Sequence, residues 1–216
     1  MADLNQHTFY FIRYPLGGGG VHLANLISTS DQFYPRIMGT TRLEYLSQLL
    51  KVYQETSKIT AHLPGQYIIS DIDPWENLLN NIDTVIPNSI HLGHAASFIW
   101  SKPILDTLKI KKYILLTANT NRSLHILQTR EKHIFGHSVF DSPYYKQELS
   151  AFYNQWFHDP GAIDDDINFP IEIEDLFQDN ITNLLDRISK KFNLIIPHHP
   201  AQELHHAWIQ RNQLVL

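Results

Sequence analysis

The sequence predicts an α/β fold with three layers, in which helices cover both faces of a central, mainly parallel β-sheet. Short apolar runs of strand length alternate along the chain with longer segments whose apolar residues recur at helical spacing. The runs are bounded by proline, glycine, aspartate or asparagine, which is typical of strands that end in turns. No repeat, low-complexity tract or linker divides the 216 residues. We therefore expect a single domain over residues 1–216.

Composition excludes several classes of protein. Hydrophobic residues make up 43% of the chain and charged residues 18%, which is typical of a folded globular protein. A net charge of −5 argues against a nucleic-acid partner. The absence of cysteine excludes disulfides and zinc–thiolate sites. The start, MADLNQHTFYFI, has an early aspartate and an apolar run too short to span a bilayer, so we expect a cytoplasmic protein without a membrane segment.

The first elements are a strand, a glycine turn and a helix. Residues 8–13 (TFYFIR) are aromatic and β-branched, which favours a strand. Apolar residues then recur at helical spacing from Val21 to Ile27. A second helix is expected from Arg42, over RLEYLSQLLKVYQE, because its leucines and Tyr53 fall on one face.

The later elements continue the alternation. Further strands are expected at four short apolar runs: QYIIS around Tyr67, SIHLG at 89–93, KYILLTA at 112–118 and PIEIE at 170–174. Helical patterns follow the strands, and three are well marked: a tyrosine-rich segment at 144–158, an amphipathic segment at 181–192, and a last helix at 201–212.

The stretch from Tyr14 to Ile27 reads YPLGGGGVHLANLI and suggests an anion site. Glycines between a strand and a helix let an anion approach the backbone, where the N–H groups of the first helical turn and the helix dipole attract it. The alternative is a flexible surface loop. Neither a nucleoside-triphosphatase loop nor a dinucleotide fingerprint fits, because His22 stands where each motif, counted from Gly17, needs a glycine.

The chain resembles the PAPS-dependent sulfotransferase family (PAPS is 3′-phosphoadenosine 5′-phosphosulfate). The family's loop, of the type YPKSGTTWLxNLI, is similar to YPLGGGGVHLANLI, and its THLP strand is similar to SIHLGH at 89–94. KKYILLTANTNRSLHI at 111–126 resembles the family's core strand and following helix, and IEDL at 173–176 resembles its YEDL. The resemblance implies a P-loop-like sulfotransferase architecture with PAPS as the donor. It implies donor contacts from the turn and the first helical residues: Gly17, Gly18, Gly19, Gly20, Val21 and His22.

Several donor contacts of the family are replaced in this chain. The loop lysine falls on Leu16, the arginine that contacts the 3′-phosphate falls near Ala118, and the helix serine falls near Ile126. His22 is one substitute cation. Arg122 and Ser123 open the helix after the core strand, where they either bind a second anion or lie as ordinary surface residues.

His91 matches the histidine of the family's THLP strand, which implies the role of catalytic base, with His94 as a second candidate. The alternative for His91 is a hydrogen-bonded core histidine. The histidine pairs at 198–199 and 205–206 have a spacing that metals use, but neighbouring histidines project in different directions. We therefore predict no metal site.

Two functions remain open at this point. The first is a sulfotransferase-like enzyme that transfers a sulfuryl group from PAPS to a hydroxyl or amine of a small-molecule or glycan acceptor. The second is a non-catalytic descendant of the fold that acts through protein contacts, using the segment 144–158. Neither the acceptor nor the oligomeric state is marked in the sequence.

Overall fold

The chain has an α/β fold built on a parallel β-sheet. The computed structural model describes residues 7–15, 17–33, 42–55, 67–68, 88–93, 109–136 and 168–212. Within them the sheet has the strand order β2-β3-β1-β4-β5, and every neighbouring pair is parallel. The strands are β1 (Thr8–Arg13), β2 (Tyr67–Ile68), β3 (Asn88–Gly93), β4 (Ile110–Thr117) and β5 (Asn168–Glu172).

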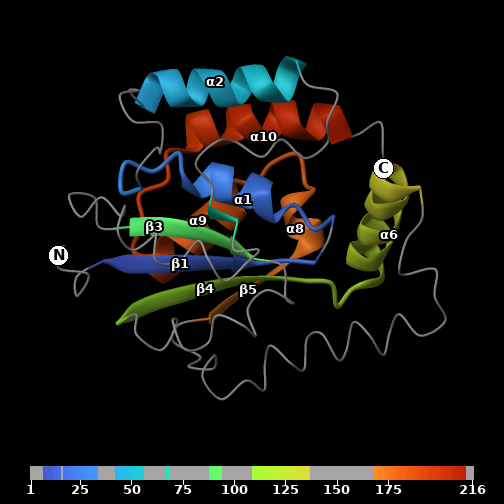
Figure 1. The fold of residues 1–216 in the computed structure, drawn as a ribbon, viewed down its shortest axis with the longest axis horizontal. Coiled ribbons are helices and arrows are strands. Elements are labelled where there is room, and N and C mark those ends of the chain that lie inside the picture. The colour runs from blue at the N-terminus through green and yellow to red at the C-terminus, as the bar shows by residue number, and fades with distance from the viewer. Residues whose placement is uncertain are drawn as a thin grey trace.

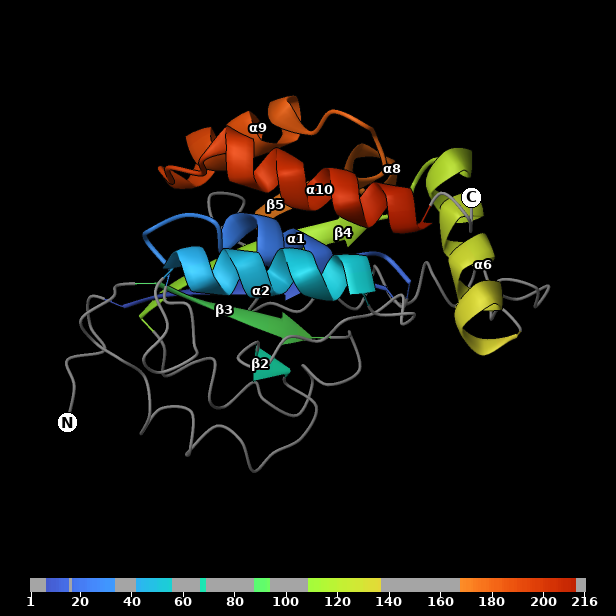
Figure 2. The ribbon, with the colours of Figure 1, turned by 90° about the horizontal axis from the view of Figure 1, so that it is seen from above.

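Helices lie over the sheet and at its end (Figure 1). They are α1 (Gly20–Ile27), α2 (Arg42–Glu55), α6 (Asn121–Phe135), α8 (Ile173–Leu176), α9 (Thr182–Phe192) and α10 (His198–Asn212). Figures 1 and 2 show α1, α2, α9 and α10 over one face of the sheet, with α6 beyond the end at which the strands finish. Helix α10 packs against both α1 and α2. The helix expected over 144–158 lies outside the described residues.

The core forms around β1, the central strand. Because β3 and β4 flank it and side chains pack on both of its faces, this strand has no polar face, and Phe9, Phe11 and Ile12 are fully buried. Tyr10 and Ile12 belong to the core under the helices. Phe11 stacks on Tyr113 of β4, with ring centroids 5.4 Å apart. Because nearly every residue of β1 is buried, the strand appears in the sequence as a short continuous apolar run, which is why it could be predicted.

The expected parallel sheet is confirmed, and two element boundaries are corrected. The strand predicted over PIEIE ends at Glu172, because the chain turns there into the short helix α8. The last helix begins at His198 and not at Ala201. Pro200 is compatible with this earlier start, because the first helical turn has N–H groups that make no intrahelical bond.

The strand order reverses direction between β1 and β4. These two strands are neighbours, but after β1 the chain continues toward β2 at one edge, whereas after β4 it continues to β5 at the other. Such a reversal leaves a crevice at the carboxyl ends of the two strands, where parallel sheets bind ligands. Helices α1 and α6 both begin at this end of the sheet (Figure 1).

Candidate functional site

The glycine turn after β1 has an alternating backbone. Gly17 and Gly19 have positive φ angles of 78° and 82°, whereas Gly18 and Gly20 do not. The N–H of Gly18 donates to the carbonyl oxygen of Pro15 at 2.9 Å and closes the turn. Left- and right-handed residues in succession turn their N–H groups toward one side, forming a concave cradle that attracts anions.

The turn is packed against its neighbours and is not a loose surface loop. A Cβ on Gly20 would overlap the ring of Tyr14, and a Cβ on Gly19 would stand 2.9 Å from a methyl carbon of Leu176. Trp208 of α10 lies 3.5 Å from that same position. The glycines therefore have packing reasons of their own, in addition to any ligand.

The first turn of α1 has no side-chain cap. Its N-cap is Gly19, and no acidic residue lies in the first turn. The first intrahelical bond runs from the N–H of Leu23 to the carbonyl oxygen of Gly19, at 3.0 Å. The backbone N–H groups before Leu23 are thus placed at the positive end of the helix dipole, beside the cradle.

His22 points into the core and not toward the crevice. Its Nε2 lies 3.0 Å from Nδ1 of His205, and its ring stacks on Trp208 at 4.0 Å. The Nε2 of His205 lies 2.6 Å from the carbonyl oxygen of Gln178. Because a carbonyl only accepts, His205 donates through Nε2, and in the neutral pair His22 donates to Nδ1 of His205.

The substitute cation expected at His22 is therefore weak at neutral pH. Burial, then the neighbouring His205, then the positive charge of Arg130 lower the pKa of His22 well below 6.5. At pH 7 the imidazole is neutral. This observation also places the charge of Arg130 within electrostatic reach of the first turn of α1.

Arg130 is a buried cation that the sequence did not reveal. Its side chain is 2% exposed, and its Cβ lies 3.5 Å from where a Cβ on Gly17 would stand. Its Nη1 donates to the amide oxygen of Asn212 at 2.6 Å, and its guanidinium lies over the rings of Phe177 and Trp208 at 5.0 and 5.2 Å.

Arg130 forms no ion pair with a carboxylate in the described part of the chain, although the buried side chain of Glu131 also packs beside Gly17. Its Nε is buried without a hydrogen-bond partner. Burial lowers its pKa to about 10, so the guanidinium remains charged at pH 7. Nothing in the sequence marks it, because a single arginine in the third turn of an amphipathic helix looks like an ordinary surface residue.

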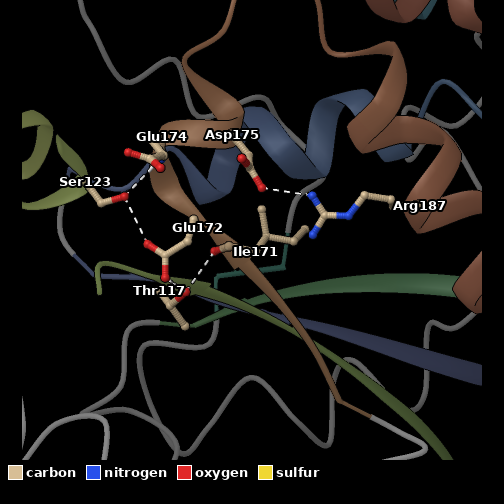
Figure 3. Close-up of polar contacts among 7 residues, drawn as sticks. All are labelled: Thr117, Ser123, Ile171, Glu172, Glu174, Asp175 and Arg187. Carbon is tan, nitrogen blue, oxygen red and sulfur yellow. Dashed lines mark hydrogen bonds and ion pairs between the residues drawn. The ribbon is translucent and has the colours of Figure 1, made fainter. Parts of the chain in front are cut away.

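The beginning of α6 is capped by the hydroxyl of Thr120, which accepts from the N–H of Ser123 at 3.0 Å, and two carboxylates bond to the side chains around it (Figure 3). Glu172, at the end of β5, accepts hydrogen bonds from the hydroxyls of Thr117 at 2.8 Å and Ser123 at 3.0 Å. It also accepts from the backbone and side-chain nitrogens of Asn119, at 3.1 and 2.6 Å. Glu174 accepts from the hydroxyl of Thr120 at 2.9 Å.

Ser123 and Arg122, the two anion contacts expected at the start of α6, differ in their surroundings. Ser123 is fully buried; its hydroxyl donates to Glu172 and accepts from the N–H of Glu174 at 3.2 Å. Arg122 is exposed. The importance of Glu172 had no signal in the sequence, because its partners come from a segment about fifty residues earlier.

The two histidines expected to act in catalysis are described only in part. His91 lies in β3, in register with Phe11 of β1 and Tyr67 of β2, while its side chain lies outside the described portion of the structure. His94 lies outside the described residues. The strand that holds His91 ends two residues later, at the same end of the sheet as the glycine turn.

The histidine pairs near the C-terminus point in different directions. His205 is buried against His22, whereas His206 contacts Gln210 at the surface. His198 pairs with Asp186 at 2.9 Å. Among the residues that the structure describes, no three histidine, aspartate or glutamate side chains are grouped so that they could hold a metal ion.

Comparison with known proteins adds no family assignment. No protein-family model matches the chain, and no curated protein matches it at a significant level. None of the helices in the described ranges is both long and apolar enough to cross a bilayer. The class defined by fold and site is therefore an α/β protein with a glycine turn at the crevice of its parallel sheet.

Proposed function

We propose that the Gly17–Gly20 turn binds the sulfate or phosphate end of a ligand. The observation that carries this proposal is the buried side chain of Arg130, whose Cβ packs beside Gly17 and whose charge acts on His22 in the first turn of α1. Burying a charge without a partner is costly, and the cost falls when an opposite charge comes close. An anion held by the turn would supply that charge, and Arg130 would take the place of the lysine that Leu16 replaces.

The backbone around the turn supports the same ligand chemistry. Gly17 and Gly19 have positive φ angles, which occur in turns that bind anions through backbone N–H groups, and α1 begins there without a side-chain cap. Both features lie at the carboxyl end of β1, beside the crevice where the strand order reverses. Backbone dipoles and a buried cation together favour a compact oxyanion such as sulfate or phosphate.

We further propose that the protein is a sulfotransferase-like enzyme with a three-layer, P-loop-like architecture, acting from a nucleotide phosphosulfate of the PAPS type. This step rests on the ordered likeness of four motifs to that family. An acceptor hydroxyl or amine attacks the sulfur atom, the bond from sulfur to the bridging oxygen of the 5′-phosphate breaks, and the acceptor proton passes to His91. The turn and Arg130 stabilise negative charge on the sulfuryl and leaving oxygens.

A second candidate is a non-catalytic descendant of the same fold. Two observations favour it: donors at the start of α6 are already bonded to Glu172, and the buried carboxylate residue Glu131 packs beside Gly17. On this alternative the chain satisfies its own anion positions and acts through contacts with another protein. The two candidates differ in whether any anion raises the stability of the protein.

A melting-temperature series tests the proposal. Wild-type protein is titrated with sodium sulfate, adenosine 5′-phosphosulfate and PAPS, and at least one of the nucleotides should give a saturable rise in Tm. A ligand at one hundred times its Kd stabilises the native state by about 2.7 kcal/mol. No saturable response to any of the three would contradict the proposal and leave the non-catalytic alternative.

The variant Arg130→Met separates binding from folding. Removing the buried charge offsets the loss of its hydrogen bond to Asn212, so the variant should fold and melt close to the wild-type temperature without ligand. It should lose at least ten-fold in affinity for the ligand that stabilises wild type. Arg187→Met is the control, because Arg187 pairs with Asp175 at the surface, and it should bind as wild type does.

A further inference from the structure

Two helices begin where the strand order reverses, and only α1 begins without a side-chain cap. Helix α1 follows β1 and helix α6 follows β4, and these strands are neighbours in the sheet. A ligand with two anionic groups would place one group at each helix. At α6 that place is taken by Glu172 (Figure 3).

The hydroxyls and the Asn119 nitrogens around the start of α6 are bonded to carboxylates of the chain. A carboxylate offers about four lone-pair positions to donors. Glu172 fills them with two hydroxyls and two nitrogens from residues 117–123, which run from the end of β4 into α6: Thr117, Ser123, and the backbone and side chain of Asn119. The remaining hydroxyl of that segment, on Thr120, donates to Glu174. A phosphate arriving here would find its donors occupied.

The sign of the charge at α6 also opposes a second anion. Glu172 and Glu174 lie at the start of the helix, and the only described cation in its first turn, Arg122, is exposed to solvent. A phosphate group brought to this place would face two carboxylates of like charge. At the glycine turn a buried cation, Arg130, packs beside Gly17 together with Glu131, so the carboxylate there does not stand alone.

We infer that the bound ligand carries its anionic groups at one end only. This inference rests on the proposed function of the glycine turn and specifies its donor: a nucleoside 5′-phosphosulfate without a 3′-phosphate, such as adenosine 5′-phosphosulfate, in preference to PAPS. Glu172 is the specificity-determining residue. Its carboxylate occupies the position of a second phosphate and supplies a negative charge that repels one.

The test compares two ligands that differ only in the 3′-phosphate. Affinities of wild-type protein for adenosine 5′-phosphosulfate and for PAPS are measured by calorimetry, and the former should bind at least ten-fold more tightly. In Glu172→Gln the affinity for PAPS should rise at least five-fold, with little change for adenosine 5′-phosphosulfate. Glu174→Gln disturbs a single hydrogen bond and should also raise the affinity for PAPS relative to adenosine 5′-phosphosulfate. This variant provides the test if Glu172→Gln does not fold.

Asp175→Asn is the matched control. Asp175 lies on the same short helix as Glu174, but it pairs with Arg187 and makes no described bond to α6, so its loss should leave the preference unchanged. PAPS binding to wild type as tightly as adenosine 5′-phosphosulfate would overturn the inference while leaving the proposed function intact. If neither nucleotide binds and sulfate has no effect, the proposed function itself fails.

Discussion

Replacing Gly20 by alanine is expected to lower the free energy of unfolding by about 3 kcal/mol, at the upper end of the range for overpacked sites. The added methyl group would overlap the ring of Tyr14, which is 5% exposed and belongs to the core under the helices. The φ angle of Gly20 is not positive, so the cost is steric and not conformational. Urea denaturation with an unchanged m value would measure it.

Two further variants isolate the cause. Gly136 has a positive φ of 75° but nothing within 4 Å of an added Cβ, so Gly136→Ala should cost only the backbone strain, about 1–2 kcal/mol. The double variant Gly20→Ala with Tyr14→Leu should recover part of the stability lost in the single variants, as a coupling term in a double-mutant cycle. A Gly20→Ala variant as stable as wild type would show that the turn is not packed as described.

Lowering the pH from 7 to 5 is expected to destabilise the protein through the buried pair of His22 and His205. Burial is the main cause that lowers the pKa of each. For His22 the charges of His205 and Arg130 act in the same direction. For His205 the carbonyl of Gln178 and the charge of Asp179 oppose the shift, and His206 adds to it.

The sign of the effect follows from the proton balance. Both histidines have a lower pKa in the folded protein than the usual 6.5, so between the two values the unfolded chain binds more protons. Their contribution to stability is complete above pH 6.5 and is lost as the pH falls toward the folded-state values. The slope of the free energy of unfolding approaches about 1.4 kcal/mol per pH unit for each histidine.

Denaturation at half-unit pH steps measures this slope. His205→Asn should reduce it, because the variant removes one of the two buried groups. His199→Asn, at an exposed position, is the control and should leave the slope as in wild type. An equal slope in wild type and His205→Asn would show that the pair does not govern the acid sensitivity. The His205→Asn variant should also weaken the packing of α10 against α1, because the contact between His22 and His205 joins the two helices.

The fold was predictable from the sequence wherever the spacing of apolar residues follows the buried face of a helix or strand. The helix expected over RLEYLSQLLKVYQE is α2, with both bounds as predicted, and the amphipathic pattern after Ile181 is α9. Buried strands and one-sided helices leave a regular trace in the sequence, because their burial repeats with the geometry of the element. The end of β5 was missed because no periodicity marks where Glu172 leaves the strand and begins a turn.

The candidate site could be anticipated only in its backbone. Four glycines between a strand and a helix indicated an anion cradle, and two of them do adopt positive φ angles. The charges around it were not visible: Arg130 meets Asn212 from 82 positions away, and Glu172 meets Ser123 from 49 positions away. His22, an expected cation, is instead a neutral core residue.

The sequence by itself determined the alternation of strands and helices, the parallel sheet and the position of the glycine turn. These features depend on local spacing and on the conformational freedom of glycine, which are properties of neighbouring residues. Only the tertiary structure decided which charges face the crevice. Burial and pairing of a charged side chain depend on elements brought together by folding, so only in the assembled structure does Arg130 become a buried cation and Glu172 the acceptor for the hydroxyls of Thr117 and Ser123.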